Sequence, residues 1–144
     1  MSLLVALDFS DVTDAQLEIV SRLARPKREI VLFHVAEPDP SFIGMEAGPE
    51  AVRDQVARQF REEHERLQAM ADRLREAGHD ARALLVRGPT IRTILEQADE
   101  AGAEVIVVGS HGHGKLFDLV VGSVSAGVIR KAKVPVLVVP SRTG

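Results

Sequence analysis

Two glycine turns near the C-terminal end of the chain have the residue types and the spacing of an anion-binding site. The first is Gly109-Ser110-His111-Gly112, the second is Gly122-Ser123-Val124-Ser125, and nine residues separate them. The first follows the apolar run 105–108, which is typical of a buried parallel strand, and the second opens a helix-forming segment. Backbone N–H groups and the positive end of a helix dipole can bind one phosphate together. The pattern therefore predicts a phosphate-binding frame.

Three other interpretations of these glycines compete with that one. From Gly109 to Lys115 the chain nearly matches the pattern GxxxxGK[ST], but Leu116 lacks the hydroxyl that binds magnesium in that motif. A dinucleotide fingerprint needs G-x-G-x-x-G after the first strand, whereas this chain has G-x-x-G-x-G after a late one, so we reject it. The third interpretation is a tight turn without a ligand, which is favoured for any single glycine.

The complete spacing, Gly109-x2-Gly112-x9-Gly122-Ser123, resembles the nucleotide-binding motif of the universal stress protein family. The resemblance covers essentially the whole chain, from residues 3–10 at the start to residues 134–140 at the end. Family members that carry this motif bind ATP. The resemblance therefore implies an ATP-binding regulatory or signalling module of the stress response.

Composition fits one globular domain over residues 1–144. The chain is 45% hydrophobic and 27% charged, with a net charge of −3. This charge and the absence of Trp and Tyr argue against a nucleic-acid partner. The absence of Cys excludes disulfides, thiol catalysis and cysteine-metal sites. No signal segment precedes the first apolar run and no run approaches the ~20 residues needed to span a bilayer, so we expect a cytoplasmic protein without membrane contact.

Short apolar runs alternate with amphipathic segments, which indicates an α/β fold. We expect strands at 3–8, 29–35, 81–86, 104–108 and 135–139, and helices at 13–25, 50–77, 90–101 and 123–132. Thr13 is expected to cap the first helix, while Gly78 and Gly102 are expected to end the second and third. The family resemblance implies a doubly wound five-stranded parallel sheet of order 3-2-1-4-5, with helices on both faces.

This strand order would bring the ends of the first and fourth strands together in a crevice where ligands bind. Asp8 is expected to end the first strand. It either caps the following turn with Ser10, or accepts a hydrogen bond from a ribose hydroxyl or adenine amine, and we favour ligand contact. His34, near the end of the second strand, is expected to be a hydrogen-bonded core or crevice histidine rather than a catalytic one.

The resemblance also implies the residues on each side of the nucleotide. On the adenosine side they are Ala6, where the family often has proline, Asp8, Val35 and Val108, and Val35 has core packing as its alternative role. On the phosphate side they are the backbones of Gly109, Gly112, Gly122, Ser123 and Val124, with hydroxyl donors from Ser123 and Ser125. The polar loop side chains His111, His113 and Lys115 either neutralise phosphate charge or face solvent. Mg²⁺ or Mn²⁺ would be carried by the phosphates.

The sequence near the loop lacks the positioned base and the cation ligands of a phosphoryl-transfer enzyme, so we expect the protein to bind ATP without efficient hydrolysis. The alternatives are a slow ATPase, a binder of AMP or cyclic AMP, and a ligand-free dimer. The last strand would lie at the sheet edge, and family members commonly pair this edge, so we expect a homodimer. The segment 37–49 is interpreted as a lid, a connector or a partner surface. The charged run 61–66 is interpreted as a solvated helix face.

Overall fold

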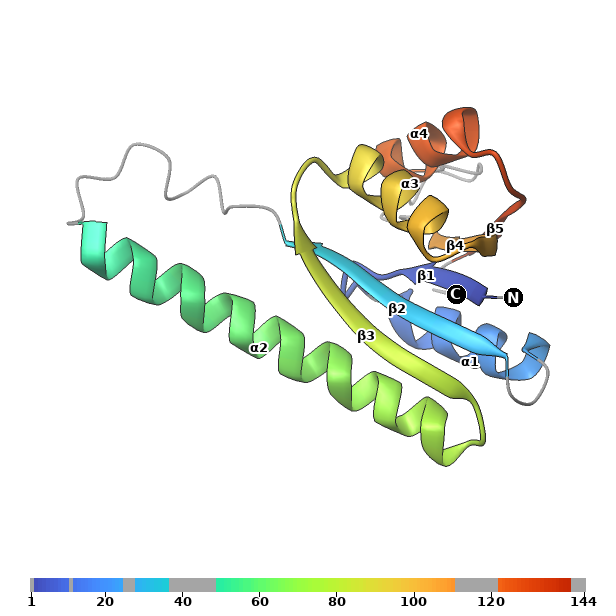
Figure 1. Ribbon diagram of the computed structural model, residues 1–144, viewed down its shortest axis with the longest axis horizontal. Coiled ribbons are helices and arrows are strands. Elements are labelled where there is room, and N and C mark those ends of the chain that lie inside the picture. The colour runs from blue at the N-terminus through green and yellow to red at the C-terminus, as the bar shows by residue number, and fades with distance from the viewer. Residues whose placement is uncertain (1, 11, 25–27, 37–48, 111–121, 141–144) are drawn as a thin grey trace.

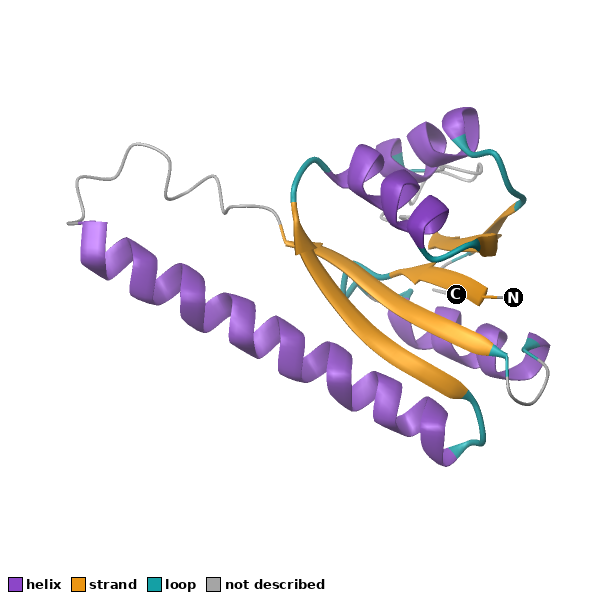
Figure 2. Cartoon of the chain, viewed as in Figure 1, coloured by secondary structure: helices purple, strands orange, loops and turns teal. Residues whose placement is uncertain are grey.

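The computed structural model describes residues 2–10, 12–24, 28–36, 49–110 and 122–140. Strands and helices alternate along these residues, as the sequence predicts (Figures 1 and 2). In chain order the elements are β1 (Ser2–Ala6), α1 (Thr13–Leu23), β2 (Glu29–Ala36), α2 (Pro49–Glu76), β3 (Asp80–Arg87), α3 (Thr90–Glu100), β4 (Ala103–Gly109), α4 (Ser123–Lys131) and β5 (Val136–Val139). No helix in these ranges is both long enough and apolar enough to cross a membrane.

The strands form one parallel sheet in the order β3-β2-β1-β4-β5, which confirms the expected fold class. Helices α1 and α2 cover one face of the sheet, and α3 and α4 cover the other (Figure 1). In the central strand β1, Leu3 and Val5 contact the first pair of helices and Leu4 contacts the second. Because both faces are covered, the inner strands are continuous apolar runs rather than alternating ones.

Two of the three expected helix boundaries are confirmed. Gly78 has a φ of 95°, and the N–H groups of Gly78 and His79 donate to the carbonyls of Arg75 and Leu74, which is the hydrogen-bond pattern of a glycine-terminated helix. Gly102, with a φ of 61°, ends α3 in a similar way. Thr13, in contrast, does not cap α1.

The residue at the capping position of α1 is Val12, which makes no side-chain cap bond. Thr13 lies one position further along, inside the helix, where its own N–H donates to the carbonyl of Ser10. Its hydroxyl is buried and has no hydrogen-bond partner. The cap prediction was therefore wrong, because the capping position is occupied by Val12 and Thr13 is already the first helical residue.

The first strand ends at Ala6 rather than at Asp8. The N–H of Leu7 still donates to the carbonyl of Phe33 at 2.8 Å, but Phe9 has a φ of 61°, in the left-handed region that ends an extended strand. Asp8 thus lies in the turn between β1 and α1. The second strand continues one residue past Val35, and α2 and α4 each end one residue earlier than expected.

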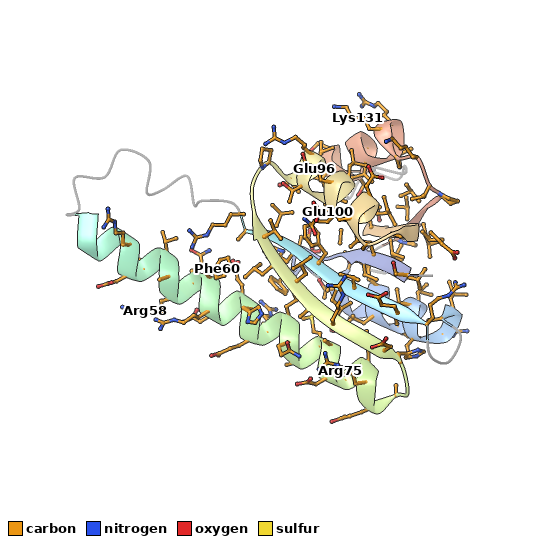
Figure 3. The ribbon with its side chains drawn as sticks, viewed as in Figure 1. Arg58, Phe60, Arg75, Glu96, Glu100 and Lys131 are labelled. Atoms are coloured by element: carbon orange, nitrogen blue, oxygen red, sulfur yellow. The ribbon has the colours of Figure 1, made fainter. Side chains whose placement is uncertain are left out.

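Helix α2 is 28 residues long and packs on the sheet only over its C-terminal half. There Leu67, Ala71 and Leu74 are buried. The N-terminal half continues past the ends of β2 and β3 (Figure 1). Where α2 passes the end of β3, the Arg87 guanidinium lies 4.7 Å from the centre of the Phe60 ring. Arg58 lies on the opposite, exposed side of the helix (Figure 3).

Candidate functional site

A cavity of about 230 Å³ lies at the carboxyl ends of β1, β2 and β4. Helices α1, α3 and α4 each contribute wall residues, so six elements of the fold converge on it. Adjacent strands β1 and β4 leave the sheet in opposite directions here, toward α1 on one face and α4 on the other. Such a switch point is where open α/β sheets place their ligands.

The structure brings together most of the residues that the sequence marked for this site. Those that line the cavity are Ala6, Asp8, Val35, Val108, Gly109, Val124 and Ser125. Gly122 and Ser123 lie at the start of α4, immediately before the two α4 residues of the wall. His111, Gly112, His113 and Lys115 lie outside the described residues, as does most of the segment 37–49.

Five further wall residues were missed at the sequence level: Leu7, Gln16, Phe33, Thr90 and Ile94. Two of them carried a usable signal. Gln16 is a polar residue on the apolar stripe of α1, beside Leu17 and Val20, and it is only 1% exposed. Thr90 begins α3 directly after Pro89, at the carboxyl end of β3. A buried amide and a helix-start hydroxyl at strand ends both indicate a ligand crevice.

One wall of the cavity is apolar. Ala6, Val35 and Val108 come from three neighbouring strands, and Ile94 of α3 packs in the same cluster. Val108 and Ile94 are each 2% exposed, so these side chains are fixed by their neighbours. A narrow wall of small and β-branched side chains can contact the face of a planar ring.

Another part of the cavity wall is the N-terminus of α4. Gly122 is its capping residue, not Ser123, and there is no side-chain cap bond. The first backbone bond of the helix runs from the Ala126 N–H to the Gly122 carbonyl, at 2.9 Å. The N–H groups of residues 123–125 therefore have no partner within the helix, and two of these residues line the cavity. Free donors and a positive dipole end favour an anion at this position.

Ser125 joins the two glycine turns. Its side chain is 2% exposed, and its hydroxyl donates to the Gly109 carbonyl over 2.7 Å. The end of β4 and the first turn of α4 are thus held together by one buried hydrogen bond. A hydroxyl group has only one proton to donate. In this structure Ser125 therefore links β4 to α4 and does not offer a side-chain donor to the cavity.

Gly109 is packed too closely for any side chain. A Cβ atom at this position would overlap Cγ1 of Val12 and lie 3.1 Å from Oε1 of Gln16. Gln16 is itself fixed, because its Nε2 donates to the Ala6 carbonyl at 3.0 Å. Packing therefore requires glycine at this position, which also lies in the cavity wall.

Asp8 makes the turn contact that the sequence allowed, and it also lies at the cavity. One carboxylate oxygen accepts a hydrogen bond from the Ser10 N–H at 2.9 Å, as a turn-capping aspartate does, and the residue also lines the cavity. His34 is a hydrogen-bonded crevice histidine, as expected, with Nδ1 2.6 Å from the Leu7 carbonyl. Among the described residues, no three His, Asp or Glu side chains are grouped to hold a metal ion.

An open parallel sheet of order 3-2-1-4-5 with helices on both faces and a cavity at its switch point defines a doubly wound α/β protein. The model of the universal stress protein family matches residues 1–140, and the chain belongs to this family. Over 143 residues it is 31% identical to the universal stress protein YxiE of Bacillus subtilis, an alignment that covers 95% of this chain and 97% of the relative.

Solved structures agree with this assignment. Protein MJ0577 of Methanocaldococcus jannaschii has a TM-score of 0.82 at 26% identity, over 99% of this chain and 97% of that one. Two more distant members share the fold: a universal stress protein in complex with cAMP has a TM-score of 0.64 at 23% identity, over 98% and 97% of the two chains. One from Archaeoglobus fulgidus in complex with dAMP has a TM-score of 0.59 at 22% identity, over 96% and 97%.

Proposed function

We propose that this chain binds ATP in the cavity and acts as a regulatory module of the stress response in the cytoplasm, without efficient hydrolysis. The observation that carries the proposal is the pairing of an apolar wall at Val35 and Val108 with the uncapped N-terminus of α4 in one cavity. An adenine ring suits the first feature and a phosphate group suits the second. Asp8 lies at the same cavity, where its carboxylate suits a ribose hydroxyl or an adenine amine.

The ligands of two solved family members support an adenine nucleotide in general. These proteins were crystallised with cAMP and dAMP, which each carry a single phosphate. For this chain we favour the triphosphate because the first turn of α4 offers several backbone donors, and because the sequence carries the family's full glycine spacing from Gly109 to Ser123. A divalent ion, Mg²⁺ or Mn²⁺, would accompany those phosphates.

The proposal is tested by identifying the nucleotide directly. Protein purified without added nucleotide is denatured, and the released small molecules are identified by mass spectrometry. Nucleotide-free protein is then titrated calorimetrically with ATP, AMP and cyclic AMP. We expect released ATP and the tightest binding for ATP in the presence of Mg²⁺. Tighter binding of AMP or cyclic AMP would transfer the assignment to that nucleotide. Steady phosphate release from ATP would instead identify the protein as a slow ATPase. If none of the nucleotides gave a binding heat, the ligand-free dimer would be the remaining alternative.

We also propose a homodimer formed through the edge strand β5. The N–H groups of Ile106 and Ser110 donate to the carbonyls of Pro135 and Val139. In a parallel strand the backbone N–H and C=O groups of alternate residues point to opposite neighbours. Because the carbonyls of Pro135 and Val139 point to β4, the N–H and C=O groups of Val138 point to the open edge. Light scattering is expected to give about twice the 15.6 kDa chain mass, and Val138→Pro is expected to give a monomer because it removes an outward donor. A monomeric wild-type protein would contradict the proposal.

A further inference from the structure

His34 connects three parts of the molecule that meet beside the cavity. It belongs to β2, lines the cavity, and contacts both the turn that follows β1 and helix α2. Its side chain is 13% exposed, so these contacts are largely shielded from water. None of the roles proposed above for the cavity uses this imidazole.

The contact with the turn sets the state of one ring nitrogen. Nδ1 lies 2.6 Å from the Leu7 carbonyl oxygen, which can only accept a hydrogen bond, so Nδ1 carries a proton and donates it. Leu7 and the next residue, Asp8, both line the cavity. The hydrogen bond therefore fixes the backbone from which the Asp8 carboxylate projects.

The contact with α2 uses the other nitrogen. Nε2 lies 3.5 Å from Oε2 of Glu63, whose side chain is 22% exposed, and it donates to this carboxylate when the imidazole carries a proton on both nitrogens. One turn further along α2, the Arg66 guanidinium lies 4.8 Å from the centre of the Phe9 ring, and this ring lies 4.4 Å from the imidazole. Positions 63 and 66 share a helix face, so α2 contacts His34 of the cavity wall through Glu63 and the neighbouring Phe9 ring through Arg66.

This geometry corrects the interpretation of the charged run as a purely solvated face. Most of its side chains are exposed, including Arg61, Glu62 and His64. Glu63 instead points to the sheet and Arg66 covers Phe9. The run therefore combines an exposed surface with one residue, Glu63, that contacts the cavity wall and one, Arg66, that covers the adjacent Phe9 ring.

We propose that His34 is a positioning residue that couples the cavity to α2: through Nδ1 it holds the Asp8 turn in binding geometry, and through Nε2 and Glu63 it transmits cavity occupancy to the helix. The inference rests on the proposed binding of ATP. A ligand that orders the turn then stabilises α2 around Glu63. By linkage, contacts that hold α2 in place raise the affinity of the cavity.

Two substitutions separate the two contacts. The side-chain amide nitrogen of asparagine occupies roughly the place of Nδ1, and that of glutamine roughly the place of Nε2. His34→Asn therefore keeps the donor to Leu7 and loses Glu63, whereas His34→Gln keeps a donor to Glu63 and loses Leu7. Glu63→Ala removes the helix contact from the other side, and Glu62→Ala, at an exposed neighbouring position, is its matched control.

The readouts are ATP affinity by calorimetry and hydrogen exchange of α2 with and without ATP. In the wild type and in Glu62→Ala, ATP is expected to slow exchange severalfold over residues 60–67. His34→Gln is expected to lower ATP affinity about tenfold, because the Leu7 carbonyl loses its buried donor. His34→Asn and Glu63→Ala are expected to lose only about threefold in ATP affinity, the loss that linkage requires when the coupling is removed, while most of the slowing in α2 disappears.

The outcomes distinguish this inference from the proposed function. If the wild type does not bind ATP, the proposed function fails and the coupling fails with it. If ATP binds but exchange in α2 does not change, or if His34→Asn and Glu63→Ala keep the full slowing, the coupling alone is overturned. Equal losses of affinity in His34→Asn and His34→Gln would also overturn it, because a general loss of packing would then explain both.

Discussion

Replacing Gly122 with aspartate is expected to weaken ATP binding about a hundredfold or more. Gly122 is the capping residue of α4, with φ −56° and ψ 159°, a conformation that aspartate and asparagine readily adopt. Both are good helix caps, so the helix itself should be preserved. A carboxylate close to a bound phosphate repels it by several kcal/mol at an effective dielectric constant of about 20, which exceeds the ~2.7 kcal/mol needed for a hundredfold loss.

The matched control for this change is Gly122→Asn, which has the same shape and no charge. It is expected to bind ATP within about threefold of the wild type. Calorimetric titration of the three proteins at two salt concentrations measures the effect, and the deficit of the aspartate variant should shrink at high salt. Equal affinities for the aspartate and asparagine variants would show that no phosphate lies at the start of α4.

Replacing Gly109 with alanine is expected to destabilise the fold by about 2–3 kcal/mol, the upper part of the range for overpacked cores. The new methyl group would overlap the Val12 side chain and crowd the Gln16 amide. These two side chains are 2% and 1% exposed and cannot move into solvent. Denaturant unfolding monitored by circular dichroism measures the loss, since the chain has no Trp.

A second substitution tests the physical cause. Val12→Ala removes the atom that the new methyl group would meet, so the double variant should be more stable than the sum of the two single effects predicts, by about 1 kcal/mol or more. Strict additivity would show that the methyl group is accommodated elsewhere. The Gly109 variant is accordingly a poor probe of nucleotide binding, because its effect on affinity would be mixed with displacement of α1.

The order and type of every described element followed from the alternation of apolar runs and amphipathic segments, together with a family resemblance that supplied the strand order. The misplacements came from local turns. Asp8 was assigned to the end of β1 because the chain stays apolar up to it, but the left-handed backbone of Phe9 has no sequence signal, since non-glycine residues rarely adopt it. Thr13 was a good capping residue one position too late.

The candidate site shows a similar division. Residues that end strands or begin α4 could be predicted, because strand ends and glycine turns are visible in the sequence. The signals of Gln16 and Thr90 were present but overlooked, whereas Ile94 could not be predicted, because it reaches the cavity only through the packing of α3 on the sheet. The importance of Glu63 was hidden for the same reason: within a run of charges, only the fold shows which one faces inward.

The N-terminal half of α2 extends past the sheet, so a small rotation of the helix moves its start by a larger distance. From Glu63 to the first residue of the helix, Pro49, is about 21 Å at 1.5 Å per residue, and this stretch lies beyond its main packing on the sheet. A tilt of about 10° around the contact with His34 would therefore displace the helix start by roughly 4 Å. A small change in helix angle at the cavity would therefore become a several-fold larger displacement at the start of α2.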